Sequence, residues 1–194
     1  MSEPANTSLR AAFSSWRVGA VWLLSISSGL PAGLVFISIP WWMAYVGIDI
    51  KTVGVLTLAQ APFAFKFLWS PLMDRFWPPL LGRKRGWVLV TQLVLAGAVG
   101  ALAWRATEPS IAFVAVMMFL ISFAAASQDI AYDAYAVEVL EKHEHGAATS
   151  LRSGMYRLAM YVSGNAVISF GPLWGWPIPW APSPSSSSRS RSSR

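Results

Sequence analysis

The chain has 194 residues, of which 55% are hydrophobic and only 12% are charged. An average globular domain has about 25% charged residues, so this composition indicates an integral membrane protein rather than a soluble domain. The net charge of +6 does not indicate a nucleic-acid partner, because most of the basic residues stand in short segments beside apolar runs. The chain has no cysteine, which excludes disulfides and thiolate metal sites.

Five apolar segments follow a polar N-terminal segment, residues 1–17, and each is near the roughly 20 residues that a helix needs to cross a bilayer. Pro31 and Pro62 interrupt the first two segments and favour kinks there. We therefore predict an all-α integral membrane bundle with transmembrane helices over residues 18–45, 52–73, 87–103, 110–137 and 148–170.

The distribution of lysine and arginine predicts that the N-terminus lies in the cytoplasm. With that orientation the outer loops hold only Lys51 and Arg105, and the inner segments hold Arg10, Arg17, Arg75, Arg83, Lys84, Arg85 and Lys142. Residues 172–194 are rich in proline, serine and arginine, and we expect them to be disordered and foreign to the rest of the chain. The odd number of spans and the abrupt change in composition favour a truncated or frame-shifted chain over a natural flexible tail.

Charged residues inside the predicted spans are the strongest functional signal, since charge in hydrocarbon is costly and commonly marks a functional site. Asp129 and Asp133 are spaced i, i+4 and so share one helical face. From helical rise, these aspartates should lie toward the inner side of the membrane. We expect the same of three basic residues of neighbouring spans, namely Lys66, Arg152 and Arg157.

Two interpretations of this cluster are open. In the first it is a substrate and proton site, in which Lys66 and Arg157 attract an anion and one aspartate carries a proton. In the second it is an ion-pair lock, which is the favoured interpretation for Asp133, Arg152 and Arg157 because charges near the membrane boundary often extend to water. Gln128 and Tyr132 could line the same polar cavity or simply be packed.

Other motifs carry less weight. The segment 141–145 contains His143, His145 and two glutamates, but a solvated charged loop is more common than a metal site with this composition, so we predict neither a metal nor a cofactor. Ser27, Ser28, Gly29 and Gly33 give the first span a face of small residues, which close helix packing explains.

Three motifs resemble those of muropeptide permeases of the AmpG type, which belong to the major facilitator superfamily. They are FKFLWSPLMDR at 65–75, QDIAYDAY at 128–135 and YRLAMYVSG at 156–164. The resemblance covers roughly residues 18–171 and identifies them as a partial six-helix repeat with five spans. The superfamily's cytoplasmic gating loop is matched in two parts, by Asp74 and Arg75 and then by Gly82, Arg83, Lys84 and Arg85. Residues 76–81 make this loop longer than the usual form.

The resemblance implies proton-driven import of anhydro-muropeptides for cell-wall recycling at a bacterial inner membrane. The partners would be the lipid bilayer, an anionic small molecule and protons, without nucleic acid. The implied site for substrate and proton coupling consists of Lys66, Gln128, Asp129, Tyr132, Asp133 and Arg157. Members of the family have at least twelve helices in two halves, so we expect that this chain alone does not transport.

Three alternatives remain. The first is transport of acetyl-CoA, which is also a bulky anion and is carried by a related branch of the family. The second is a non-transporting sensor, and the third is an inactive remnant. An enzyme is disfavoured. The spacing of Asp129 and Asp133 resembles part of a phospholipid-head-group transferase motif, but the upstream Asp-Gly and Ala-Arg elements of that motif are missing, as is the Gly-Asp motif of intramembrane aspartyl proteases.

Overall fold

The computed structural model describes residues 16–76, 83–105, 110–140 and 145–170, and within these ranges the chain is helical, with no strand. The first segment consists of α2 (Trp16–Gly33), the π-helical turn η1 (Leu34–Ser38) and α3 (Ile39–Tyr45). Pro31 lies inside α2, just before the π-helical turn. Because proline lacks an N–H group, it removes one helical hydrogen bond, and the helix type changes three residues later, at Leu34. The kink predicted at Pro31 stays a prediction.

The second segment, predicted over residues 52–73 with one interruption at Pro62, is broken into several short pieces. Its order is α4 (Ile50–Leu56), η2 (Thr57–Gln60), α5 (Ala61–Phe65), η3 (Lys66–Leu68) and α6 (Ser70–Arg75), where η2 and η3 are 3₁₀ turns. Pro62 and Pro71 each stand in the first turn of a new α-helical piece, where a missing N–H group costs least. Hydropathy alone could not show this division.

Three longer helices complete the described chain, namely α7 (Arg83–Trp104), α8 (Ile111–Val139) and α9 (His145–Phe170). Segments Trp16–Tyr45, Gly86–Trp104 and Ile111–Glu138 are long and apolar enough to cross a membrane. The structure therefore confirms an all-α membrane bundle. The second and fifth predicted spans do not meet the same criterion, because one is divided into short pieces and α9 is less apolar than the other long helices; both stay predictions.

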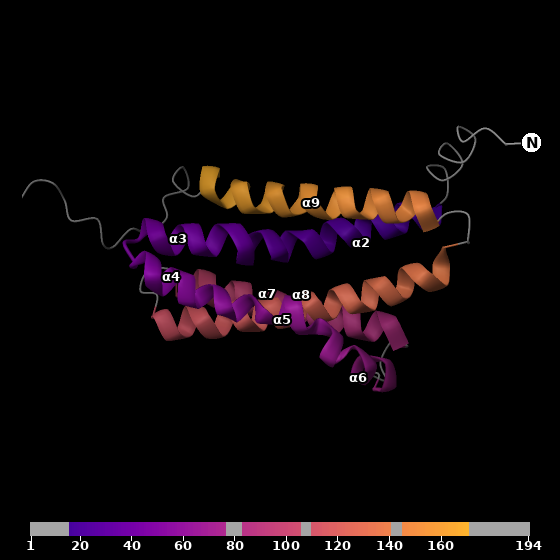
Figure 1. Ribbon diagram of the computed structural model, residues 1–194, viewed down its shortest axis with the longest axis horizontal. Helices are drawn as coiled ribbons and strands as arrows, with labels where there is room; N and C mark the ends of the chain where they lie inside the picture. Colours follow the sequence, from indigo (N-terminus) through magenta and orange to yellow (C-terminus); the bar gives the residue numbers. More distant parts are fainter. Residues whose placement is uncertain (1–15, 77–82, 106–109, 141–144, 171–194) are drawn as a thin grey trace, which may run out of the picture.

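The helices pack as two layers (Figure 1). In one layer α9 lies alongside α2, and in the other α7 and α5 pack against α8; α2 joins the two layers through its contact with α8. An apolar core of α3, α4, α7 and α8 side chains fills one end of the bundle, and its fully buried members include Met43, Val114, Met118 and Ile121. This arrangement brings the middle of α2 against the second half of α8.

Glycines allow the close approach of α2 and α9. A methyl group on Gly33 would collide with the carbonyl oxygen of Met160 and the hydroxyl of Ser163, and one on Gly164 would come within 2.8 Å of Ile37 Cβ. Small residues at helix interfaces let backbones approach closely in membranes, where apolar packing replaces the hydrophobic effect as the source of attraction. The predicted role of the small face of the first span is thereby confirmed for its glycines.

We predict that Gly33→Ala destabilises the bundle by about 1–3 kcal/mol, because the added methyl group must push α2 away from α9. The measurement is thermal unfolding of the chain in lipid nanodiscs. Gly97→Ala in α7 is the matched control, since a methyl group there would meet no atom within 4 Å. Equal stability of the Gly33→Ala and Gly97→Ala chains would contradict the close packing of α2 on α9.

Candidate functional site

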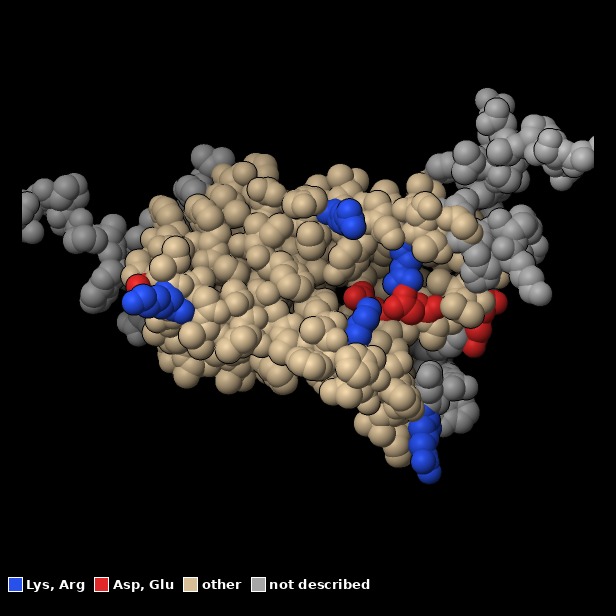
Figure 2. Space-filling view, viewed as in Figure 1, with Lys and Arg blue, Asp and Glu red and all other residues tan. Residues whose placement is uncertain are grey.

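Four charged side chains from three parts of the chain meet beside the α2–α8 contact. Asp129 and Asp133 project from one face of α8, Lys66 comes from the 3₁₀ turn η3, and Arg152 comes from α9. We call these four residues the charged cluster. Figure 2 shows acidic and basic side chains gathered in a hollow between the α2–α9 layer and the layer that contains α5 and α8. The predicted proximity of these four residues is therefore present in the structure.

Lys66 bridges the two carboxylates of the charged cluster. Its Nζ atom lies 3.8 Å from Oδ2 of Asp129 and 3.8 Å from Oδ2 of Asp133. The other carboxylate oxygen of Asp133 forms an ion pair with Arg152. The side chain of Asp129 is 10% exposed, whereas those of Lys66 and Asp133 are 37% and 43% exposed. The cluster thus has one buried carboxylate and an open rim that a polar solute could reach.

Sequence reasoning missed a fifth member of this site. The hydroxyl of Ser28, a buried residue of α2, donates a hydrogen bond to Oδ1 of Asp129. Each oxygen of the buried carboxylate therefore has a partner, which is what a charge removed from water requires. The sequence offered only the small size of Ser28 as a signal, and that signal indicated packing.

Trp69 fixes the irregular segment that carries Lys66. Its indole Nε1 donates a hydrogen bond to Oγ of Ser127 over 3.1 Å, and its ring lies 4.9 Å from that of Phe123, both on α8. Ser127 is only two residues before Asp129. The indole contacts therefore set the position of the 3₁₀ turn relative to the carboxylates.

Gln128 and Tyr132 do not join the charged cluster but form a neutral network on another face of α8. The amide of Gln128 donates to the hydroxyl of Tyr132 over 2.8 Å, and both lie 3.4 Å from Oγ of Ser27 on α2. From α7, the hydroxyl of Thr91 bonds to Gln128 and the amide of Gln92 bonds to Ser27. Their predicted role in substrate or proton coupling stays untested, and here they tie α8 to α2 and α7.

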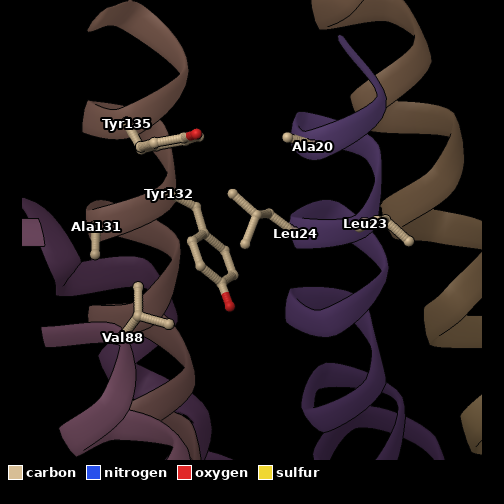
Figure 3. A pocket seen from close by; sticks show the side chains of 7 residues that line it. All are labelled: Ala20, Leu23, Leu24, Val88, Ala131, Tyr132 and Tyr135. Carbon is tan, nitrogen blue, oxygen red and sulfur yellow. The ribbon is translucent and has the colours of Figure 1, made fainter. Parts of the chain in front are cut away.

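Two pockets lie beside this neutral network rather than at the charged cluster. One, of about 330 Å³, is lined by α2, α7 and α8, and Figure 3 shows Tyr132 and Leu24 pointing toward each other across it. The other, of about 470 Å³, is lined by α2, α7 and α9 together with Gln128. Their walls are mainly apolar, so they are grooves between helices and not polar sites for an anion.

The remaining predicted site residues lie apart from the charged cluster. Arg157 is exposed on α9, and no ion pair joins it to another described residue. Helix α6 ends with Asp74 and Arg75, and α7 begins with Arg83, Lys84 and Arg85. The two parts of the predicted gating loop therefore belong to different helices. Gly82 and His143 lie outside the described residues. Within the described part of the chain no group of three histidine or acidic side chains could hold a metal ion.

Comparison with known proteins supports a transporter. The family model described as "Acetyl-coenzyme A transporter 1" matches residues 20–163, which include the charged cluster. The chain belongs to this family. It is 39% identical over 165 residues to the "Anhydromuropeptide permease" of Escherichia coli K12, and equally to that of E. coli O157:H7, with 84% of the chain and 34% of each relative covered. An uncharacterised protein of Haemophilus influenzae is 33% identical over 150 residues, which cover 77% of the chain and 35% of that protein.

These matches confirm the resemblance to muropeptide permeases. The chain spans about a third of the length of the curated relatives that it matches. The relatives with informative names are transporters, and the apolar helices agree with a multi-pass membrane protein.

We predict that Lys66→Met lowers the stability of the chain more than the double substitution Lys66→Met, Asp129→Asn does. The single change leaves a buried carboxylate without its cation, whereas the double change removes both charges. Because Lys66 is 37% exposed, the single cost should stay below the about 3–5 kcal/mol of a fully buried pair. Unfolding in nanodiscs measures both, and a double variant no more stable than Lys66→Met alone would contradict the interaction of Lys66 with Asp129.

Proposed function

We propose that this chain forms part of a proton-coupled importer of anhydro-muropeptides that serves cell-wall recycling. The observation that carries the proposal is the charged cluster, which places two cations and two carboxylates among apolar helices, in a chain 39% identical to a protein named anhydromuropeptide permease. Lys66 and Asp133 are more than a third exposed, so a polar solute can reach the rim of the cluster.

The chemistry of the proposed site is a competition for cations. Lys66 is paired with both Asp129 and Asp133, and Arg152 is paired with Asp133. A carboxylate of an incoming muropeptide would bind Lys66 in place of the aspartates. Asp133 would keep Arg152 as its partner, whereas the buried Asp129 would become an anion without a cation. Proton uptake by that aspartate removes its charge, so binding of the substrate anion and of a proton favour each other.

The two aspartates differ in their suitability for this exchange. Asp133 lies at the open rim between Lys66 and Arg152, where a solute can reach it, whereas Asp129 is buried and also held by Ser28. We therefore assign contact with the substrate to the rim, together with Lys66, and proton carriage to Asp129. Arg157 is exposed and unpaired with described residues, so it would attract the anion during approach, as the sequence suggested.

We further propose a bacterial inner membrane as the location, with the N-terminus in the cytoplasm. The named relatives are bacterial, and the excess of lysine and arginine in the predicted inner segments supports this orientation.

A second candidate is transport of acetyl-CoA, which the description of the matching family model favours. Acetyl-CoA carries phosphate groups in place of carboxylates, and the same cations could hold it. Competition separates the two functions, since excess unlabelled acetyl-CoA should block uptake of labelled anhydro-muropeptide only if the cations serve both. A third candidate, a non-transporting sensor, would bind anhydro-muropeptide without moving it.

The test is a chimera in which residues 16–170 replace the matching segment of the E. coli permease in a strain that lacks its own. We expect proton-dependent uptake of labelled anhydro-muropeptide by this chimera. Lys66→Ala and Asp129→Asn should each abolish it, because the first removes the cation and the second the proton carrier. His143→Ala, at a position between α8 and α9 in the sequence, is the control and should have no effect.

Other outcomes have distinct meanings. If Lys66→Ala and Asp129→Asn both kept wild-type uptake, the cluster would be an ion-pair lock. A chimera that reaches the membrane and binds anhydro-muropeptide but accumulates none would support the sensor. Uptake of acetyl-CoA in place of the muropeptide would establish the second candidate.

A further inference from the structure

Ser28 donates its hydroxyl to a carboxylate, whereas Ser38 and Ser163, which also bond across helices, donate to backbone carbonyl oxygens. Ser25 and Ser127 donate to the backbone carbonyl four residues earlier in their own helices, over 2.6 and 2.7 Å, and Thr91 does likewise. This is the ordinary way in which a helical serine satisfies its hydroxyl. Ser28 instead donates to Asp129, which lies 101 positions away in the sequence.

The bond from Ser28 determines how the buried carboxylate is oriented. Ser28 engages Oδ1 of Asp129, and Oδ2 then lies 3.8 Å from Nζ of Lys66. Ser28 and Asp129 are 3% and 7% exposed, so water cannot easily substitute for either partner. Without the hydroxyl, the carboxylate could turn about its side-chain bonds and Oδ2 would no longer be held toward Lys66.

The backbone beside Ser28 makes this contact possible. Gly29, the next residue, packs so closely on α9 that a methyl group in its place would lie 2.9 Å from Cβ of Ala159. The rotation of α2 is therefore fixed at this point, and with it the direction in which Ser28 projects. Pro31 follows within the same turn, and the helix becomes π-helical at Leu34.

We propose that Ser28 is a positioning residue for proton coupling, because it holds the carboxylate of Asp129 in register with Lys66. This inference rests on the proposed function, in which Asp129 carries the proton. No atom of Ser28 needs to touch the substrate.

Isotope-edited infrared spectroscopy of the complete chain in lipid nanodiscs tests the contact without requiring transport. With ¹³C-labelled aspartate, the difference between the wild type and Asp129→Asn isolates the absorption band of the Asp129 carboxyl group. Ser28→Ala should shift this band, and Ser28→Thr should restore it because threonine retains the hydroxyl. Ser25→Ala is the matched control, since Ser25 is equally buried on the same helix and donates only to its own backbone.

An unchanged Asp129 band in Ser28→Ala, or an equal shift in Ser25→Ala, would overturn the inference. In the chimeric permease, Ser28→Ala should lower uptake about tenfold, which corresponds to about 1.4 kcal/mol, and Ser28→Thr should restore it. A shifted band with undiminished uptake would confirm the contact but overturn Ser28 as a positioning residue, whereas wild-type uptake by Asp129→Asn would overturn the coupling role of Asp129 itself. The two failures are thus distinguishable.

Discussion

The cost of burying the carboxylate of Asp129 is the constraint on which the arrangement of these helices depends. A charged side chain at the centre of a transmembrane helix costs about 2.5–3.5 kcal/mol even on insertion scales, and more without partners. Here the partners come from α2, through Ser28, and from the second segment, through Lys66. Three parts of the chain must therefore converge at one point of α8 for the buried charge to be compensated.

The irregular second segment follows from the same constraint. Backbone that departs from the α-helix is tolerated at membrane depth only where protein covers it or where it lines a polar cavity. Lys66 opens the 3₁₀ turn η3, and Trp69, directly after that turn, is bound to α8 through Ser127. The break in the helix thus lies beside the charged cluster, where packing and polar partners both support it.

Features that depend on hydropathy averaged over several residues could be predicted from the sequence. Apolar runs located the five helical segments, and charge inside them located the cluster, because hydropathy and depth are properties of whole turns. The contacts of individual side chains were harder to predict. Arg157 is five residues after Arg152, which turns it away from Asp133 by more than a quarter of a helical revolution, since each residue advances the helix by about 100°. The role of Ser28 could not be predicted, because a serine in a helix ordinarily bonds to its own backbone, as Ser25 does.

The neutral network and the charged cluster together determine the rotation of α8. Gln128 and Asp129 are adjacent in sequence, so their side chains project about 100° apart, and Ser27 and Ser28 stand in the same relation on α2. Ser27 contacts Gln128 and Ser28 contacts Asp129, so adjacent residues of α2 contact adjacent residues of α8. A rotation of either helix by one residue would break both contacts at once and would place the carboxylate toward the apolar grooves that Gln128 and Tyr132 now line. The neutral hydrogen bonds therefore contribute to the charged cluster, because they stabilise the setting of α8 in which Asp129 faces Lys66.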